Sequence, residues 1–190
     1  MAITIYESFA AHTRLPVKLQ DVRDFILERQ ICSRIERHPT DLDPSILRGG
    51  LHRYYELAPP YVERPMVARI AYPRDASEGV QRLIQVKEML HILDPRDATS
   101  PTKKDVEDFI GDLLVEEAEK DIGLAAKVDH IKLLNALCIL MPRDALDVIR
   151  PVYKRGDVSL DQIAAEARIP KSYAGAALTD DWREVVERIT

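Results

Sequence analysis

The chain has 190 residues, of which 46% are hydrophobic, and its 27 lysines and arginines against 32 aspartates and glutamates give a formal net charge of −5. Such a length and composition fit a globular protein of one domain, or one domain with a small appendage, that buries a real core. The acidic balance argues against a protein whose main task is to bind phosphate backbones, because such binding needs surplus lysine and arginine.

The sequence carries no signature of export or of membrane insertion. Residues 1–7 lack a basic region followed by an apolar run, and no apolar stretch approaches the length of about 18 residues that a membrane span requires. The two cysteines, Cys32 and Cys138, lie far apart in apolar surroundings. They predict neither a disulfide framework nor a metal-binding pair, and we expect both to be reduced and buried. The expectation is a soluble, cytoplasmic protein.

The first half of the chain predicts a helix and two strands. Apolar residues at spacings of three and four favour a helix over 17–37, ended by Pro39. The segment 41–50 is predicted as a short turn or helix, because it closes on two glycines. Two strands are predicted over 51–57 and 66–72, each followed by proline.

The remainder of the chain predicts helices alone. The strongest pattern covers 75–93, and the apolar character of 127–141 on nearly all sides is typical of a helix at the centre of a core. Further helices are expected over 100–120, 143–153, 159–167, 171–178 and 180–189. The acidic run 105–121 is either a solvated helix face or a docking surface for a basic partner. The fold class is therefore α+β, mostly α. The expected division is an N-terminal helical segment (1–48), a core (49–155) and a C-terminal element (156–190) packed on the core.

The stretch 82–91, Arg-Leu-Ile-Gln-Val-Lys-Glu-Met-Leu-His, is similar to the active-site helix of a zinc peptidase. In the usual motif, H-E-x-x-H, two histidines one turn apart bind zinc and the glutamate acts as general base. Glu88 and His91 occupy the places of the base and the second ligand, whereas Lys87 replaces the first histidine. The alternative interpretation is a satisfied histidine at the edge of a buried face, beside plain surface charge at Lys87 and Glu88.

Residues downstream extend the resemblance to the ImmA/IrrE family of zinc peptidases. Members carry an Arg-Phe-x-x-Ala-His-Glu-Leu-Gly-His stretch, a later helix with Glu-Ala-Asn-x-Phe-Ala-Ala-x-Leu-Leu-Met-Pro, and often a small helix-turn-helix-like element. This chain has the stretch 82–91, then Asn-Ala-Leu-Cys-Ile-Leu-Met-Pro over 135–142, and an element of the third kind over 159–178. The resemblance covers about residues 50–180. It implies a minimal zincin-like core with a small sheet, in which the strand 66–72 is the edge strand.

The resemblance also implies that the metal site is incomplete. The family's metal-binding glutamate on the Leu-Met-Pro helix aligns with an isoleucine, Ile131. Weaker candidate ligands beside His91 are Asp94, Asp129 and His130. A catalytic zinc takes three protein ligands and keeps one position for water, so we expect no cofactor, with zinc as the alternative.

Lys87 is expected to place an ammonium near the vacant metal site, paired with Glu88 or with an acid of the later helix. Such a fixed charge stands in for the cation but cannot activate water as zinc does.

Two further basic residues are candidate binding residues, Arg82 within the motif and Lys171 in the C-terminal element. The apolar spacing over 159–178 fits a helix-turn-helix, with Arg168 at the place of the usual turn glycine. The second helix carries one cation, Lys171, so we expect a structural role for it rather than the reading of DNA. Trp182 is expected to anchor the last helix to the core.

Three functions follow as hypotheses. The first is a non-hydrolytic pseudo-peptidase that binds a protein partner, such as a transcriptional regulator, in the phage or stress-response setting that the resemblance implies. The second is a zinc metallopeptidase with a rearranged site that cleaves a regulator protein, with Glu88 as the base. The third is a DNA-binding transcriptional regulator that uses the C-terminal helices, although nucleic acid is the less favoured partner. No membrane partner is expected.

Overall fold

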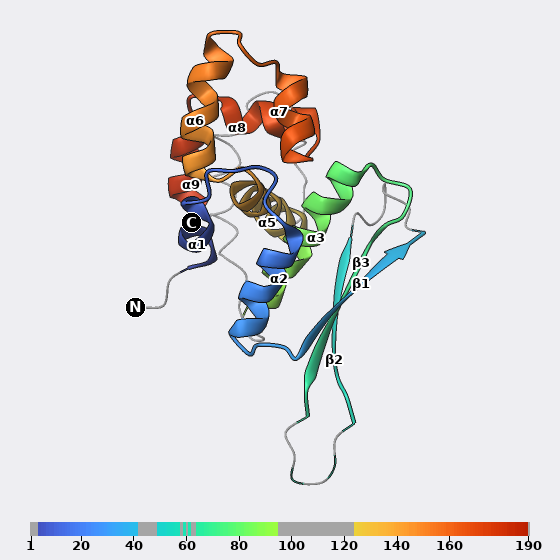
Figure 1. The fold of residues 1–190 in the computed structure, drawn as a ribbon. Coiled ribbons are helices and arrows are strands. Elements are labelled where there is room, and N and C mark those ends of the chain that lie inside the picture. Colours follow the sequence, from blue (N-terminus) through green and yellow to red (C-terminus); the bar gives the residue numbers. More distant parts are fainter. Residues whose placement is uncertain are drawn as a thin grey trace.

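A computed structural model describes residues 4–41, 49–57, 59, 61, 64–94 and 124–189, with the side chains of 124–130 and 189 outside the description. Within these ranges eight helices and a small three-stranded sheet form an α+β fold in which helix dominates (Figure 1). The predicted fold class is thereby confirmed. The predicted helix over 100–120 and the acidic run 105–121 lie outside the described residues, as does nearly all of the segment 41–50.

The chain begins with a short helix that the sequence analysis missed, α1 (Ile5–Ala10). Thr4 caps it: the Thr4 hydroxyl accepts a hydrogen bond from the Glu7 backbone N–H at 3.3 Å. In return the Glu7 carboxylate accepts from the Thr4 backbone N–H at 2.8 Å. This reciprocal capping box satisfies two backbone donors at the helix start. Ile5 and Phe9 are the residues that α1 buries.

The predicted helix over 17–37 is wrong in its second half. Helix α2 (Leu19–Glu28) ends where Gln30 takes a left-handed φ of 56°, a conformation that an α-helix cannot continue through. The chain then forms strand β1 (Arg34–Thr40), in which Ile35 is buried and its neighbours are more exposed.

Strand β3 (Met66–Pro73) is the centre of the sheet, whose strand order is β1-β3-β2. It runs parallel to β1 and antiparallel to β2 (Gly50–Tyr55). Both strands predicted from the sequence are thus confirmed. The expectation that 66–72 is an edge strand is wrong, because β3 has a hydrogen-bonded neighbour on both sides: β2, which was predicted, and β1, which was not. A central strand needs apolar residues on both faces, and 66–68 are buried without interruption.

Helix α3 (Glu78–Ile92) lies between the sheet and helix α5 (Leu124–Leu140), and α2 also packs against it. Because these elements enclose it, every residue over 82–90 is buried. The single apolar face expected for this helix was too narrow a description, although both predicted helices are confirmed.

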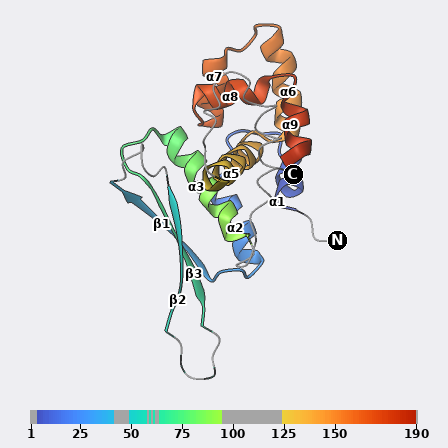
Figure 2. The same cartoon turned by 180° about the vertical axis from the view of Figure 1, so that it is seen from behind.

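Four helices form the C-terminal part, at the end of the molecule opposite the β2–β3 hairpin (Figures 1 and 2). They are α6 (Arg143–Lys154), α7 (Leu160–Ala167), α8 (Lys171–Leu178) and α9 (Trp182–Ile189). All four were predicted. Trp182 is 3% exposed and belongs to the same buried cluster as Ile5 and Ile70, so it does anchor α9 to the core.

The turn between α7 and α8 rests on the first turn of α3. Arg168 ends α7 with a left-handed φ of 52°, the conformation in which glycine is usual. A Cβ atom on Gly79 would lie 2.9 Å from the carbonyl carbon of Ile169, closer than side-chain carbons approach backbone. Gly79 is therefore what allows the turn to seat against α3.

Candidate functional site

Lys87 and Glu88 form an ion pair inside the protein. Lys87 Nζ lies 2.8 Å from Glu88 Oε1, and each side chain is 4% exposed. The interpretation of these residues as plain surface charge is therefore wrong, whereas their predicted pairing is what the structure shows. A Cβ on Gly49 would lie 2.9 Å from Glu88 Oε1, so the backbone that leads into β2 closes over the carboxylate.

The burial of this pair determines what it can do. Moving an isolated charge from water into the protein interior costs several kcal/mol. Removal of one partner of a buried ion pair therefore destabilises a protein by about 3–5 kcal/mol, because the other charge is left unpaired. Each of the two charges thus depends on the other. The Glu88 carboxylate, already engaged by an ammonium and closed off by Gly49, is badly placed to take a proton from a water molecule.

His91 belongs to a second group of charged side chains, at the end of α3. Its Nδ1 lies 3.0 Å from Asp94 Oδ2, and the other oxygen of Asp94 accepts a hydrogen bond from Lys132 Nζ of α5. Arg53 of β2 donates to the backbone carbonyl oxygen of His91. Burial raises the pKa of Asp94, but the hydrogen bonds with His91 and Lys132 outweigh it and leave that pKa below its ordinary value of 3.8.

The structure thus brings four of the predicted site residues together in two pairs, Lys87 with Glu88 inside α3 and His91 with Asp94 at its C-terminal end. Lys132 was missed by the sequence analysis, although it stands one position after Ile131, the residue aligned with the family's metal-binding glutamate. Asp129 and His130 lie in α5, but their side chains are outside the described residues. Among the side chains that are described, no three of His, Cys, Asp and Glu are grouped to hold a metal ion.

The two candidate binding arginine and lysine residues make contacts within the fold. Arg82 is 7% exposed and donates through Nη2 to the backbone oxygen of Val17 at 2.7 Å, which fastens α3 to the segment before α2. Lys171 is exposed, and its Nζ lies 2.8 Å from Asp161 Oδ1 of α7. A ligand at Lys171 would have to compete with that carboxylate.

The two cysteines differ in burial, contrary to the expectation that both are buried. Both thiols are free, but only Cys32 is buried. Cys138 is half-buried, because it lines a cavity between helices. Burial raises the pKa of the Cys138 thiol to about 12, so the thiol stays protonated and is a poor nucleophile at neutral pH.

Comparison of the chain with family models, with curated proteins and with solved structures finds no match. In the described ranges, every helix is too short or too polar to cross a bilayer. What the site can do is therefore argued from the side chains described above.

Proposed function

We propose that this chain is a zincin-like relative of the ImmA/IrrE peptidases that does not hydrolyse peptides and acts by binding a protein partner in a regulatory setting. The observation that carries the proposal is the buried ion pair of Lys87 and Glu88, with 2.8 Å between Nζ and Oε1. By the resemblance, Lys87 occupies the place of the first zinc-binding histidine of the motif. A fixed cation neutralises carboxylates as zinc does, but it cannot lower the pKa of a bound water.

A second lysine supports the same function. Lys132 of α5 places its ammonium against Asp94, beside His91. In the family that helix supplies an acidic metal ligand, and here it supplies a cation. A catalytic zinc takes three protein ligands, whereas the described side chains offer His91 with one carboxylate that a lysine already engages.

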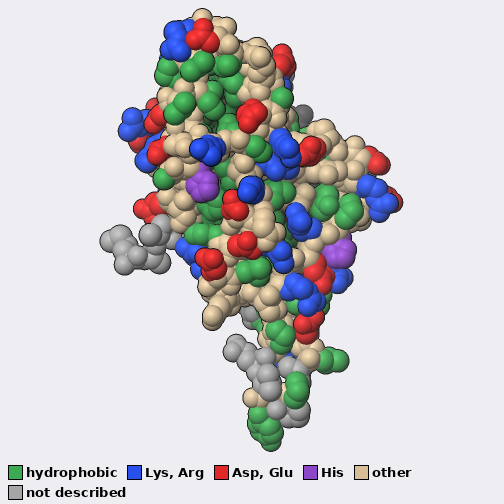
Figure 3. Space-filling model, viewed as in Figure 1, with side chains coloured by type: hydrophobic (Ala, Val, Ile, Leu, Met, Phe, Trp, Pro, Cys, Tyr) green, Lys and Arg blue, Asp and Glu red, His purple; other side chains and the backbone are tan. Residues whose placement is uncertain are grey.

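The end of the β2–β3 hairpin supports the binding of a partner. Three apolar or aromatic side chains are exposed there: Tyr55 is 45% exposed, and Leu57 and Tyr61 are almost completely so. The hairpin projects from the helical body, and hydrophobic side chains gather at its tip (Figures 1 and 3). Apolar clusters of this kind mark contact sites, and tyrosine is enriched in protein interfaces.

The metal content of the purified protein tests the non-hydrolytic function. Elemental mass spectrometry, without added zinc or chelator, should find far less than one zinc per chain. About one zinc per chain would overturn the proposal. Lys87→His sharpens the test: it should not create tight zinc binding, because a third ligand is missing as well. Nanomolar zinc affinity in this variant would mean that an acid near Asp129 completes a site.

Capture of a partner tests the binding role. The double variant Leu57→Asp/Tyr61→Asp should lose proteins that the wild type retains on an affinity column. Val148→Asp is the matched control, because Val148 is also an exposed apolar residue, 58% exposed, but lies on α6. Identical captured proteins from all three columns would contradict binding through the hairpin tip.

An active metallopeptidase is the second candidate, and one observation favours it. The carboxylate of Asp94 lies 3.0 Å from His91 Nδ1, as acidic partners do behind metal-ligating histidines in zinc enzymes. With zinc bound, Glu88 would be the general base, and Glu88→Gln would abolish peptidase activity while zinc stays bound. Absence of peptidase activity in the zinc-loaded wild type would rule this candidate out, and activity that persists in Glu88→Gln would exclude Glu88 as its base. DNA binding has no comparable support, since Lys171 is engaged by Asp161.

A further inference from the structure

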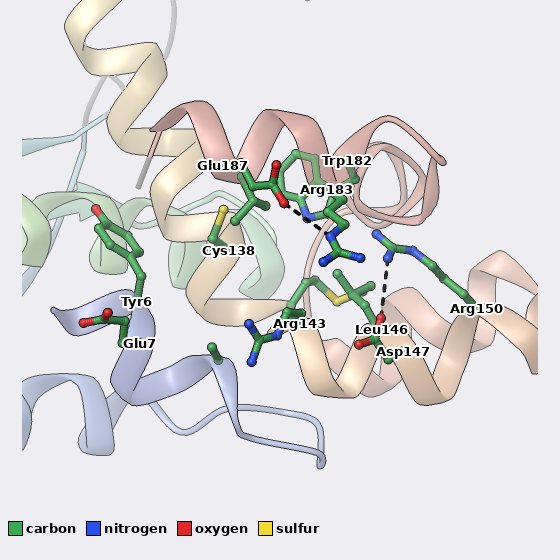
Figure 4. Close-up of a pocket in the computed structure, with 13 residues that line it drawn as sticks. Tyr6, Glu7, Cys138, Arg143, Leu146, Asp147, Arg150, Trp182, Arg183 and Glu187 are labelled. Carbon is green, nitrogen blue, oxygen red and sulfur yellow. Dashed lines mark hydrogen bonds and ion pairs between the residues drawn. The ribbon is translucent and has the colours of Figure 1, made fainter. Parts of the chain in front are cut away.

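A cavity of about 360 Å³ lies between α1, α5, α6 and α9, away from the ion pairs of α3 (Figure 4). Its volume is within the range of about 300–1,000 Å³ that is usual for small-molecule sites. Part of the wall is apolar and includes Met141 and Leu146, each 1% exposed. The charged part of the wall consists of three arginines (Arg143, Arg150 and Arg183) and three acids (Glu7, Asp147 and Glu187).

Two buried hydrogen-bond donors on this wall have no acceptor among the described residues. They are Nε1 of Trp182, whose side chain is almost completely buried, and Nε of Arg150. Leaving a buried donor unsatisfied costs about 1–3 kcal/mol, so an acceptor that enters the cavity would gain this energy. In Figure 4, Trp182, Arg150 and Arg183 lie on one side of the cavity, and Tyr6 lies across from them.

The acids that line the cavity already have hydrogen-bond or ion-pair partners, and for two of them the partner is an arginine of the same wall. Glu187 pairs with Arg183 at 3.3 Å, and Asp147 lies 3.9 Å from Arg150, both with exposed carboxylates. Glu7 accepts from the backbone of Thr4 in the capping box of α1. The buried polar atoms of the wall that lack a partner among the described residues are therefore the two N–H donors of Arg150 and Trp182, and they adjoin an apolar surface.

We propose that this cavity binds an amphipathic carboxylate, such as a medium-chain fatty acid. The carboxylate would lie between the guanidinium groups and the indole N–H of Trp182, because charged acceptors form the strongest hydrogen bonds with these donors. The apolar body would lie against Met141 and Leu146. This site goes beyond the proposed function and is independent of it, since the cavity wall includes neither Lys87 nor Glu88.

The position of the tryptophan gives a direct test. Trp182 is the single tryptophan of the chain, so its fluorescence reports what enters the cavity. Titration of the full chain with sodium decanoate, below the concentration at which decanoate forms micelles, should change this fluorescence saturably. The expected Kd is on the order of 10–100 μM. Decanol, which has the same chain and a neutral head, should bind at least about tenfold more weakly.

Variants of the rim separate a specific site from general apolar binding. Arg143→Gln/Arg183→Gln should weaken decanoate binding about tenfold. Both side chains are mostly exposed, so the fold should survive. Arg155→Gln is the matched control, because Arg155 is exposed, pairs with Asp157 and does not line the cavity. It should bind decanoate as the wild type does.

Three results would overturn the proposal: no saturable fluorescence change in the wild type, equal affinities for decanoate and decanol, or an unchanged affinity in the double variant. If the double variant does not fold, the comparison of the two head groups in the wild type still decides. Because neither measurement involves zinc or a protein partner, failure here is distinct from failure of the proposed function.

Discussion

This protein has two groups of paired acidic and basic side chains that differ mainly in their burial. On the sheet surface, Glu36 accepts hydrogen bonds from Arg69 and Arg34, each at 2.9 Å, and both arginines are 46% exposed. These bonds lower the pKa of Glu36 to about 2, and the bond from Arg69 has the largest effect. Inside α3, Lys87 and Glu88 lie 2.8 Å apart at 4% exposure. Water can replace each contact of the surface cluster, but it cannot reach the buried pair in the same way. We therefore expect burial, and not the number of contacts, to rank the two clusters in stability.

The largest effect is expected from Lys87→Met, which leaves Glu88 buried without its ammonium. The free energy of unfolding should fall by about 3–5 kcal/mol, measured by urea denaturation. The double variant Lys87→Met/Glu88→Leu should recover most of this loss, because it removes both charges and keeps the volume. A single variant as stable as the wild type would contradict the burial argument.

Lys132→Met should have an intermediate effect, because this lysine and Asp94 are 19% and 32% exposed. We expect a loss of about 1–2 kcal/mol, between the values for surface and buried pairs. Lys154→Met is the matched control, since Lys154 pairs with Asp180 in an exposed position. The comparison would fail if both lysine variants lost the same stability in parallel urea titrations.

Asp94 should link stability to pH. Although burial opposes it, hydrogen bonding with His91 and Lys132 holds the folded-state pKa of Asp94 below its ordinary value of 3.8. The folded state then binds fewer protons, so the stabilisation is present above that ordinary value and is lost as pH falls through the lowered pKa. The difference in free energy of unfolding between wild type and Asp94→Asn should shrink between about pH 6 and about pH 3. A difference that stays constant would show that Asp94 does not titrate in this way.

Glu36→Gln should have the smallest effect, despite the low pKa of its carboxyl. Both arginines can turn to water, so the melting temperature at neutral pH should change by little more than the scatter between repeats. High salt should reduce even this change, because exposed charges are screened. A destabilisation that equals that of Lys87→Met would break the comparison between the two clusters.

The long helices could be predicted from the sequence because their apolar spacing agrees with their burial, as in α3 and α5. Strand β1 could not, since only Ile35 of its seven residues is buried and the apolar spacing of α2 continues into it. Helix α1 was missed although Thr4 and Glu7 carry a capping-box pattern. Elements as short as these show little periodicity in their sequence. For residues 34–40 the pairing with β3 determines the strand conformation.

The candidate site was predictable where it depends on neighbouring residues. The pairing of Lys87 with its neighbour Glu88 was among the predicted alternatives, whereas the sequence did not separate this pair from His91, which lies against Asp94. The contact of Lys132 with Asp94 joins residues 38 positions apart, and the packing of α3 on α5 determines it. The cavity around Trp182 was missed for the same reason, because helices near the two ends of the sequence, α1 and α9, meet α5 and α6 at its wall.

The contact of Gly79 with the backbone of Ile169 bears on how this chain can change over evolutionary time. A side chain at position 79 must displace the α7–α8 turn, and a change in that turn must still leave room for the first turn of α3. The C-terminal helices are therefore not a module that recombination can exchange freely. Lineages that inherit the helix with the lysine–glutamate pair should keep the turn that rests on it.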